Sequence, residues 1–161
     1  MRKLTLILGL LLATVAAHAQ FEQNKWFVNP SLTGLNFSYS KAAKSNFGIQ
    51  AQGGAFIIDN AALLLTLGAD WSSPVDIYTV GVGGRYYFDQ NGIFLGTGFK
   101  FNRYKYSSLS NINDFAWNLE AGYAFFLSRT VTVEPSVYYD LSFKDSDLSQ
   151  FGFKIGFGFY F

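Results

Sequence analysis

Apolar and polar residues alternate with a period of two in one segment of this sequence after another. The clearest case is the C-terminal segment 151–161, where every odd-numbered residue is phenylalanine or isoleucine and every even-numbered residue is glycine, lysine or tyrosine. Successive side chains of an extended strand point to opposite faces, so this segment has one apolar face and one small or polar face. The alternation therefore predicts β-strands.

The same pattern predicts eight strands in all. Their expected limits are 26–39, 46–57, 61–71, 76–88, 92–106, 114–126, 130–143 and 151–161. Most exceed the ~5 to 6 residues usual in soluble sheets and reach the ~9 to 11 residues that a tilted strand needs to cross a bilayer. The first strand is the least regular, because its apolar phase changes near Thr33 and Gly34, which fits a bulge.

The connections between the predicted strands alternate between short and long. The short ones are 59–60, 89–92 and 128–129, and the mostly longer, polar ones are 40–45, 72–75, 107–113 and 144–150. Transmembrane β-barrels have this arrangement, with short turns at the periplasmic end and longer loops outside.

The polar faces of the predicted strands carry many charged and amide side chains. They are Gln50, Gln52, Asp70, Arg85, Lys100, Glu120, Glu134, Asp140 and Lys154. A soluble core could not hold so many charges cheaply, whereas lipid requires an outward apolar face and a closed sheet without edges. We therefore predict an all-β fold, an eight-stranded antiparallel up-and-down transmembrane β-barrel. The alternative is a soluble β-sandwich or lipocalin-like carrier with an aromatic core.

The N-terminus has the features of a cleavable signal peptide. Arg2 and Lys3 precede an apolar stretch at 4–17, and the following Ala17-His18-Ala19 has the small-x-small form that signal peptidase reads. The alternative is that this segment is retained as an N-terminal membrane anchor. The stretch is shorter than the ~20 residues of a transmembrane helix, which favours the signal peptide. We expect a signal peptide at 1–19 and one barrel domain at 20–161.

Composition argues against several classes of function. Segment 20–161 holds 10 basic and 11 acidic residues without a long run of either sign, which argues against a nucleic-acid partner. The chain has no cysteine, and its one histidine, His18, leaves with the predicted signal peptide. The mature chain then lacks the usual base that activates serine or water. We predict no catalysis, no cofactor and no metal site.

The predicted signal peptide, the eight alternating strands and the terminal sequence at 157–161 together resemble the eight-stranded outer-membrane barrels of the outer-membrane protein X and protein A transmembrane-domain type. The resemblance covers the whole predicted mature chain. It implies the outer membrane of a Gram-negative bacterium and contact with its lipid and lipopolysaccharide. It also implies that Phe157, Phe159 and Phe161 form the signal read by the barrel assembly machinery.

This sequence departs from that family in its modest loops and in two prolines inside predicted strands. Proline cannot donate a hydrogen bond to the β-ladder, so Pro30 and Pro135 each need a bulge or a local gap. The alternating pattern therefore defines the limits of these two strands least well.

The inward charges are expected to form a lumen charge network. The expected pairs, on neighbouring strands, are Asp70 with Arg85, Lys100 with Glu120, and Glu134 with Lys154. Because an eight-stranded barrel is just wide enough for its own side chains, we interpret the network as internal neutralisation. The expected protein is a monomer with a structural, envelope-integrity or surface-interaction role. A narrow, porin-like solute or ion pore and a lipid-modifying barrel enzyme remain alternatives.

Overall fold

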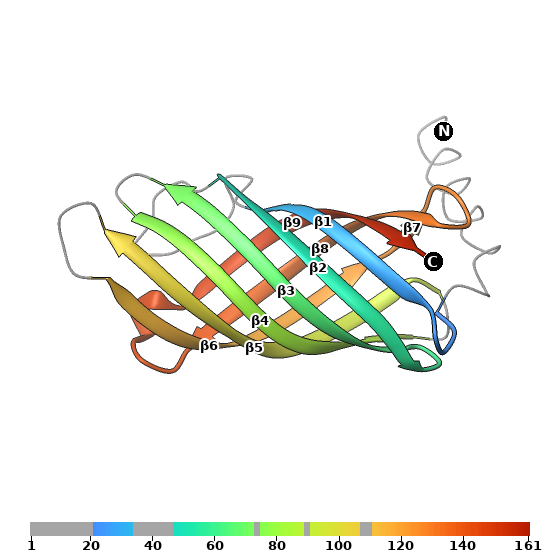
Figure 1. Ribbon diagram of the computed structural model, residues 1–161, viewed down its shortest axis with the longest axis horizontal. Helices are drawn as coiled ribbons and strands as arrows, with labels where there is room; N and C mark the ends of the chain where they lie inside the picture. The colour runs from blue at the N-terminus through green and yellow to red at the C-terminus, as the bar shows by residue number, and fades with distance from the viewer. Residues whose placement is uncertain (1–20, 34–46, 73–74, 89–90, 107–110) are drawn as a thin grey trace, which may run out of the picture.

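The protein forms a closed antiparallel β-barrel (Figure 1). The structure, a computed structural model, describes residues 21–33, 47–72, 75–88, 91–106 and 111–161. Its strands are β1 (Trp26–Thr33), β2 (Phe47–Ile58), β3 (Ala61–Ser72), β4 (Val75–Tyr87), β5 (Ile93–Tyr106), β6 (Ile112–Tyr123), β7 (Phe125–Phe126), β8 (Val131–Ser142) and β9 (Gln150–Tyr160). A short 3-10 helix, η2 (Ser146–Leu148), precedes β9. The predicted signal peptide lies outside the described residues.

The barrel closes because its last strand pairs with its first. Each of β1 to β5 pairs with the next strand along the chain, β8 pairs with β6, β7 and β9, and β9 returns to β1. β6 and β7 pair with β8 in one continuous register and are separated only at Ala124. They are two parts of a single strand, so the predicted eight-stranded up-and-down barrel is confirmed.

The predicted strand limits agree with the structure to within three residues wherever both ends are described. The first strand is described only as far as Thr33, and the bulge predicted at 33–34 extends beyond the described residues. The structure adds an irregularity that the pattern did not predict: the register of β2 on β3 shifts between Phe56 and Ile58.

Both strand prolines lie at gaps in the ladder, one of the two outcomes predicted for them. The pairing of β1 with β9 is interrupted between Val28 and Ser31, on either side of Pro30, without a change of register. The pairing of Pro135 toward β6 and β7 is likewise absent, and the break between those two segments lies opposite it. The other side of each proline pairs normally, because a missing N–H removes only one ladder bond.

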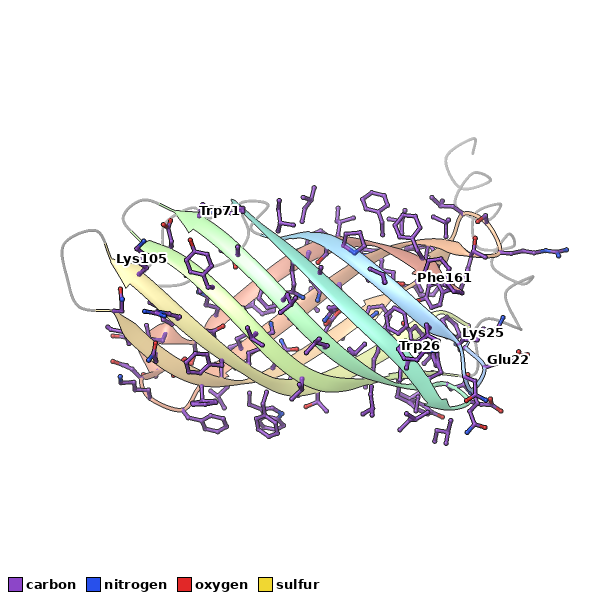
Figure 2. All side chains as sticks on the ribbon, in the orientation of Figure 1. Glu22, Lys25, Trp26, Trp71, Lys105 and Phe161 are labelled. Atoms are coloured by element: carbon purple, nitrogen blue, oxygen red, sulfur yellow. The ribbon has the colours of Figure 1, made fainter. Side chains whose placement is uncertain are left out.

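The apolar face of the sheet points away from the barrel axis (Figure 2). Leu65 and Val82, in the middle of β3 and β4, are 52% and 59% exposed, whereas the alternating Thr66 and Arg85 are 5% and 3% exposed. A soluble barrel would bury the apolar side chains and expose the charged ones. The soluble alternative is therefore wrong.

The two ends of the barrel differ in their connections. One end, here called the turn end, carries the turns at 59–60 and 127–130, the end of β4 and the start of β5, and the start of β1 and the end of β9 (Figure 1). Asn60 and Gly92 adopt positive φ angles of 66° and 91° there, which tight turns require. At the opposite end, here called the loop end, lie the ends of β1, β3 and β5, the starts of β2, β4 and β6, and the connection 143–149. No helix among the described residues is long and apolar enough to cross a membrane.

Candidate functional site

An aromatic cluster fills the lumen at the turn end. Its members, here called the aromatic plug, are Phe21, Phe27, Phe56, Tyr87, Phe94 and Tyr160, each at most 2% exposed. The rings come from the ends of five strands, β1, β2, β4, β5 and β9, and from the segment that precedes β1. Ring centroids 5.2 Å apart in the stacked pair Phe27 and Tyr160 show that the rings pack directly on one another.

Phe21 completes the aromatic plug from outside the sheet. Its ring stacks on Tyr87 with centroids 3.9 Å apart, and its exposed fraction is 0%. Its carbonyl oxygen accepts a 2.7 Å hydrogen bond from the amide of Asn60, and the amide of Gln23 donates to the carboxylate of Asp59 at 2.9 Å. These bonds fasten the N-terminal segment across the β2–β3 turn, so that Phe21 closes the mouth of the barrel.

Arg85 lies just above the aromatic plug and links several strands across the lumen. Its two terminal nitrogens donate to Glu134 at 2.8 Å, Gln52 at 2.7 Å, Glu120 at 3.1 Å and the hydroxyl of Tyr87 at 3.1 Å. The guanidinium also covers the ring of Phe94, 4.0 Å from its centroid. Arg85 therefore joins the polar part of the lumen to the aromatic part.

The carboxylate of Glu134 accepts four hydrogen bonds from side chains. The amide of Asn29 and Arg85 donate to one oxygen at 2.6 and 2.8 Å, and the hydroxyls of Thr132 and Tyr160 donate to the other at 2.7 Å each. Each oxygen thus has two donors, and these four hydrogen bonds replace the ones to water that the carboxylate loses on burial. One of the four donors is the guanidinium of Arg85, so Glu134 links β8 to β4 across the lumen.

A second carboxylate and a lysine complete this ionic layer. Glu120 bonds Arg85 through one oxygen and the ammonium of Lys154 through the other, the latter at 2.9 Å. All four side chains are at most 4% exposed. Two cations face two anions, so the ionic layer formed by Arg85, Glu120, Glu134 and Lys154 is formally neutral.

A third anion and cation pair lies nearer the loop end. The ammonium of Lys100 donates to both carboxylate oxygens of Asp140 at 3.0 Å, and the amide of Asn118 donates to one of them at 2.6 Å. Lys100 also lies 5.2 Å from the centroid of the buried Tyr138 ring. Further toward the loop end, Thr79 donates to Asn102 and Ser142 donates to Asp114, each at 2.8 Å.

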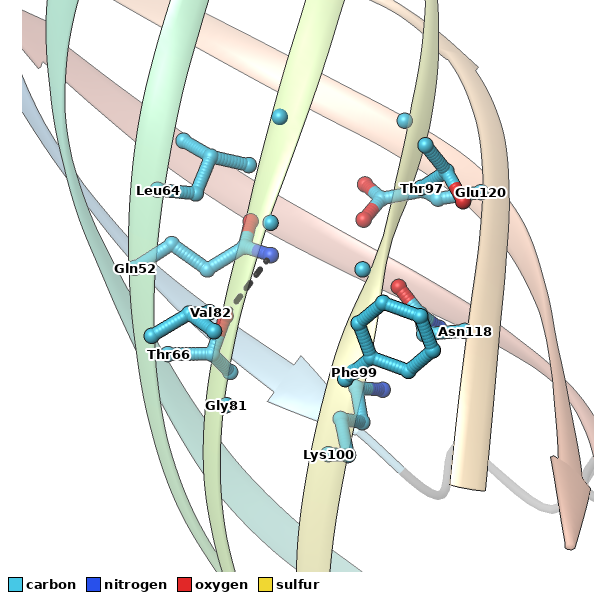
Figure 3. Close-up of a pocket in the computed structure, with 14 residues that line it drawn as sticks. Gln52, Leu64, Thr66, Gly81, Val82, Thr97, Phe99, Lys100, Asn118 and Glu120 are labelled. Carbon is cyan, nitrogen blue, oxygen red and sulfur yellow. Dashed lines mark hydrogen bonds between the residues drawn. The ribbon is translucent and has the colours of Figure 1, made fainter. Parts of the chain in front are cut away.

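The space left between these side chains is small. A cavity of about 10 Å³, bordered by Gln52, Thr66, Asn118 and Glu120, lies beside the glycines of β4 and β5 (Figure 3). A second cavity, of about 20 Å³, lies between Asp70 and the Lys100 pair. Each has room for about one water molecule. Apart from the aromatic plug, the described part of the lumen is therefore a packed polar interior.

All six residues predicted for the lumen charge network face inward, but the predicted pairs are wrong. Arg85 lies opposite Ala62 and Asp70 lies opposite Ile77, so the two side chains are eight positions apart along the same ladder. At roughly 3.3 Å per residue they cannot meet. Lys100 pairs with Asp140 instead of Glu120, and Lys154 pairs with Glu120 instead of Glu134.

Sequence reasoning missed the aromatic part of the lumen. Tyr87 and Tyr160 lie on the inward face in the alternating pattern, and their hydroxyls share a 3.0 Å hydrogen bond. A tyrosine at an inward position beside charged residues is the signal that could have identified them. Phe21 carries no such signal, because it precedes the first strand and belongs to no alternating segment.

The predicted assembly residues lie on the outward face of β9, the strand that closes the barrel. Phe157 and Phe159 are exposed there, and Phe161 follows the end of the strand at the turn end. The amide of Phe161 donates to Trp26 and its carbonyl accepts from Trp26 in return, which fastens the C-terminus to β1. All three rings are accessible from outside the barrel.

Among the described residues, no group of three or more histidine, cysteine, aspartate or glutamate side chains is placed to hold a metal ion. The carboxylates of Glu120, Glu134 and Asp140 are occupied by basic, hydroxyl and amide donors. The arrangement can hold the barrel together and exclude solvent from its interior.

Several solved structures share this fold. The N-terminal β-barrel domain of OprF from Pseudomonas aeruginosa matches with a TM-score of 0.68 and 16% identity, over 86% of this chain and 98% of that one. Neisserial surface protein A matches with a TM-score of 0.67 and 13% identity, over 85% and 97%. Ail from Yersinia pestis, solved in a phospholipid nanodisc, matches with a TM-score of 0.56 and 12% identity, over 86% and 100%.

No protein-family model matches the sequence, and no curated protein matches it. The likeness to known structures is therefore one of fold: that of the eight-stranded outer-membrane β-barrels, as the sequence predicted.

Proposed function

We propose that this protein is an integral outer-membrane β-barrel with a structural, envelope-integrity or surface-interaction role and no catalysis. The observation that carries the proposal is the division of its side chains. The outward face is apolar over the middle of the barrel, and the charges of the ionic layer are bonded to one another inside it. Hydrocarbon favours such a surface and water does not.

The filled lumen supports a structural role over the alternative of a narrow pore. A passing ion would have to cross the ionic layer and then the aromatic plug, in which Phe21 is fully buried. The cavities between them are close to the size of one water molecule. Conduction would require several buried salt bridges to open together, which is costly in a low dielectric.

The proposal also covers the biogenesis of the barrel and its surface contacts. We propose that a signal peptide at 1–19 directs export, that Phe157, Phe159 and Phe161 are read by the barrel assembly machinery, and that the barrel works as a monomer. The loop end then faces the outside, as the longer connections of such barrels do. Any surface ligand would meet the loops there, in particular the connection 143–149 with its acidic η2.

Two measurements on the intact protein test this proposal. Reconstitution in planar bilayers is expected to give no discrete conductance steps, and steps that change in Lys100→Gln or Glu120→Gln would favour the pore instead. A deletion strain is expected to show altered envelope permeability or surface binding with an unchanged lipid A mass spectrum. A change in lipid A composition would favour the lipid-modifying enzyme.

A further inference from the structure

Two basic side chains stand on the outward face of β5 at the loop end. Arg103 and Lys105 are two positions apart, so they project from the same face of the strand, and both are exposed. Figure 2 shows Lys105 at the end of the barrel opposite to Glu22, Lys25 and Phe161. Within the described strands, the outward-facing positions that carry charge are these two and Asp76, all at the loop end.

Neither cation is neutralised within the part of the chain that the structure describes. Among the described residues, neither Arg103 nor Lys105 takes part in a salt bridge or a side-chain hydrogen bond, whereas Lys100, Lys154 and Arg85 in the lumen are all paired. In the β-ladder Lys105 lies opposite Asp76, yet the two form no ion pair. Arg103 lies between Tyr78 on β4 and Asn113 on β6. The two cations are free to bind an external anion.

Their surroundings indicate which anion. Directly below Arg103 along the strand lies Phe101, whose ring packs edge-on against Phe115 with centroids 5.0 Å apart. Tyr78 is 44% exposed beside them. Aromatic rings of transmembrane barrels mark the boundary between hydrocarbon and headgroups. The cations therefore stand at the depth of the headgroups, on strand positions that face lipid.

We propose that Arg103 and Lys105 form a binding surface for the phosphate-bearing headgroup of an outer-leaflet lipid. The inference rests on the proposed function, because a lipid reaches these side chains only if the outward face lies in a bilayer. The guanidinium of Arg103 can bind two phosphate oxygens at once, and Lys105 adds a second charge one pleat further out. The acyl chains of the same lipid would cover Phe101 and Phe115. Asp76 lowers the affinity of this surface for anions.

The proposal is tested by measuring lipid adducts of the full-length folded barrel by native mass spectrometry in a neutral detergent. The probes are dimyristoyl phosphatidylglycerol and the zwitterionic dimyristoyl phosphatidylcholine. The wild type is expected to retain the anionic lipid in preference. In the double variant Arg103→Gln, Lys105→Gln, the affinity for the anionic lipid should fall by about five-fold for each cation removed, so that the preference disappears. Asp76→Asn should strengthen it.

Lys25→Gln with Arg129→Gln, which removes two cations at the turn end, is the matched control and should leave the preference unchanged. An equal lipid preference in wild type and the Arg103, Lys105 double variant would overturn the proposal. So would binding of a heparin fragment, instead of the anionic lipid, that depends on these two residues, since it would identify a soluble polyanion as the ligand.

Failure of this proposal is distinguishable from failure of the proposed function. The double variant changes only exposed side chains, so it should still fold and insert into vesicles, as its heat-dependent migration in detergent gels will show. A double variant that inserts normally but keeps the wild-type lipid preference would contradict the proposed lipid site and leave the proposed function standing. A wild type that does not insert into vesicles removes the barrel function itself.

Discussion

Arg85 and Glu134 form a 2.8 Å salt bridge across the lumen, although 49 positions separate them in the sequence. Arg85 comes from β4 and Glu134 from β8, so the bond spans the interior between strands that do not pair. Both side chains are 1% exposed. The salt bridge links β4 and β8 directly across the lumen, whereas the β-ladder connects them only through the strands that lie between them.

Replacing Glu134 by glutamine is expected to lower the free energy of unfolding by about 3–5 kcal/mol, because it leaves Arg85 without one of its two buried anions. Arg85→Met should have a comparable effect. The double variant should lose less stability than the two single variants lose together, since Glu120 and Lys154 remain as a neutral pair. Guanidinium unfolding in detergent micelles measures all three, with the exposed Glu22→Gln as the control.

Phe21→Ala is expected to lower the free energy of unfolding by about 3 kcal/mol, since it opens a cavity in the aromatic plug. The exposed Leu127→Ala, at the same end of the barrel, should change it little. The same unfolding experiment compares the two variants. Equal stability of Phe21→Ala and the wild type would mean that the N-terminal segment does not close the mouth.

Gly158→Ala is expected to destabilise the barrel by about 1–3 kcal/mol. A methyl group there would collide with Thr132, Glu134 and the ring of Tyr160, three members of the bonded lumen. Gly53→Ala is the matched control, because nothing lies within 4 Å of the position that its methyl group would take. Unfolding midpoints of the two alanine variants should therefore separate, and coinciding midpoints would contradict the packing described for Gly158.

Val82→Lys is expected to cost about 2–4 kcal/mol in lipid vesicles, the penalty of a cation on the lipid face at mid-membrane depth. Leu127→Lys, at the turn end, should cost at most about 1 kcal/mol. The comparison is made by unfolding from vesicles in urea. A similar small cost for both variants would place Val82 in contact with water.

The strands, their limits and the inward or outward direction of each side chain were predictable from the sequence, because all three follow from a local period of two. The partners of Arg85 were not. They depend on the register between strands and on contacts across the lumen, neither of which a local pattern contains. The sequence therefore predicted that Asp70 and Arg85 face the lumen, and placed them together although they lie toward opposite ends of it.

Phe21 shows a second limit. Its burial depends on the path of the chain before β1 and on a hydrogen bond to the distant Asn60 amide, and no periodic pattern marks either. The two prolines show the opposite case. The chemistry of Pro30 and Pro135 alone predicted an interruption of the ladder, and the structure has a gap beside each.

The direction of the apolar face is the central claim, and site-directed spin labelling tests it most directly. The chain has no cysteine, so single cysteines at Leu65 and Thr66 can each carry one label. In vesicles, the label at Leu65 should collide readily with oxygen and little with a water-soluble nickel complex, while the label at Thr66 should be shielded from oxygen. Oxygen accessibility that is higher at Thr66 than at Leu65 would contradict the account.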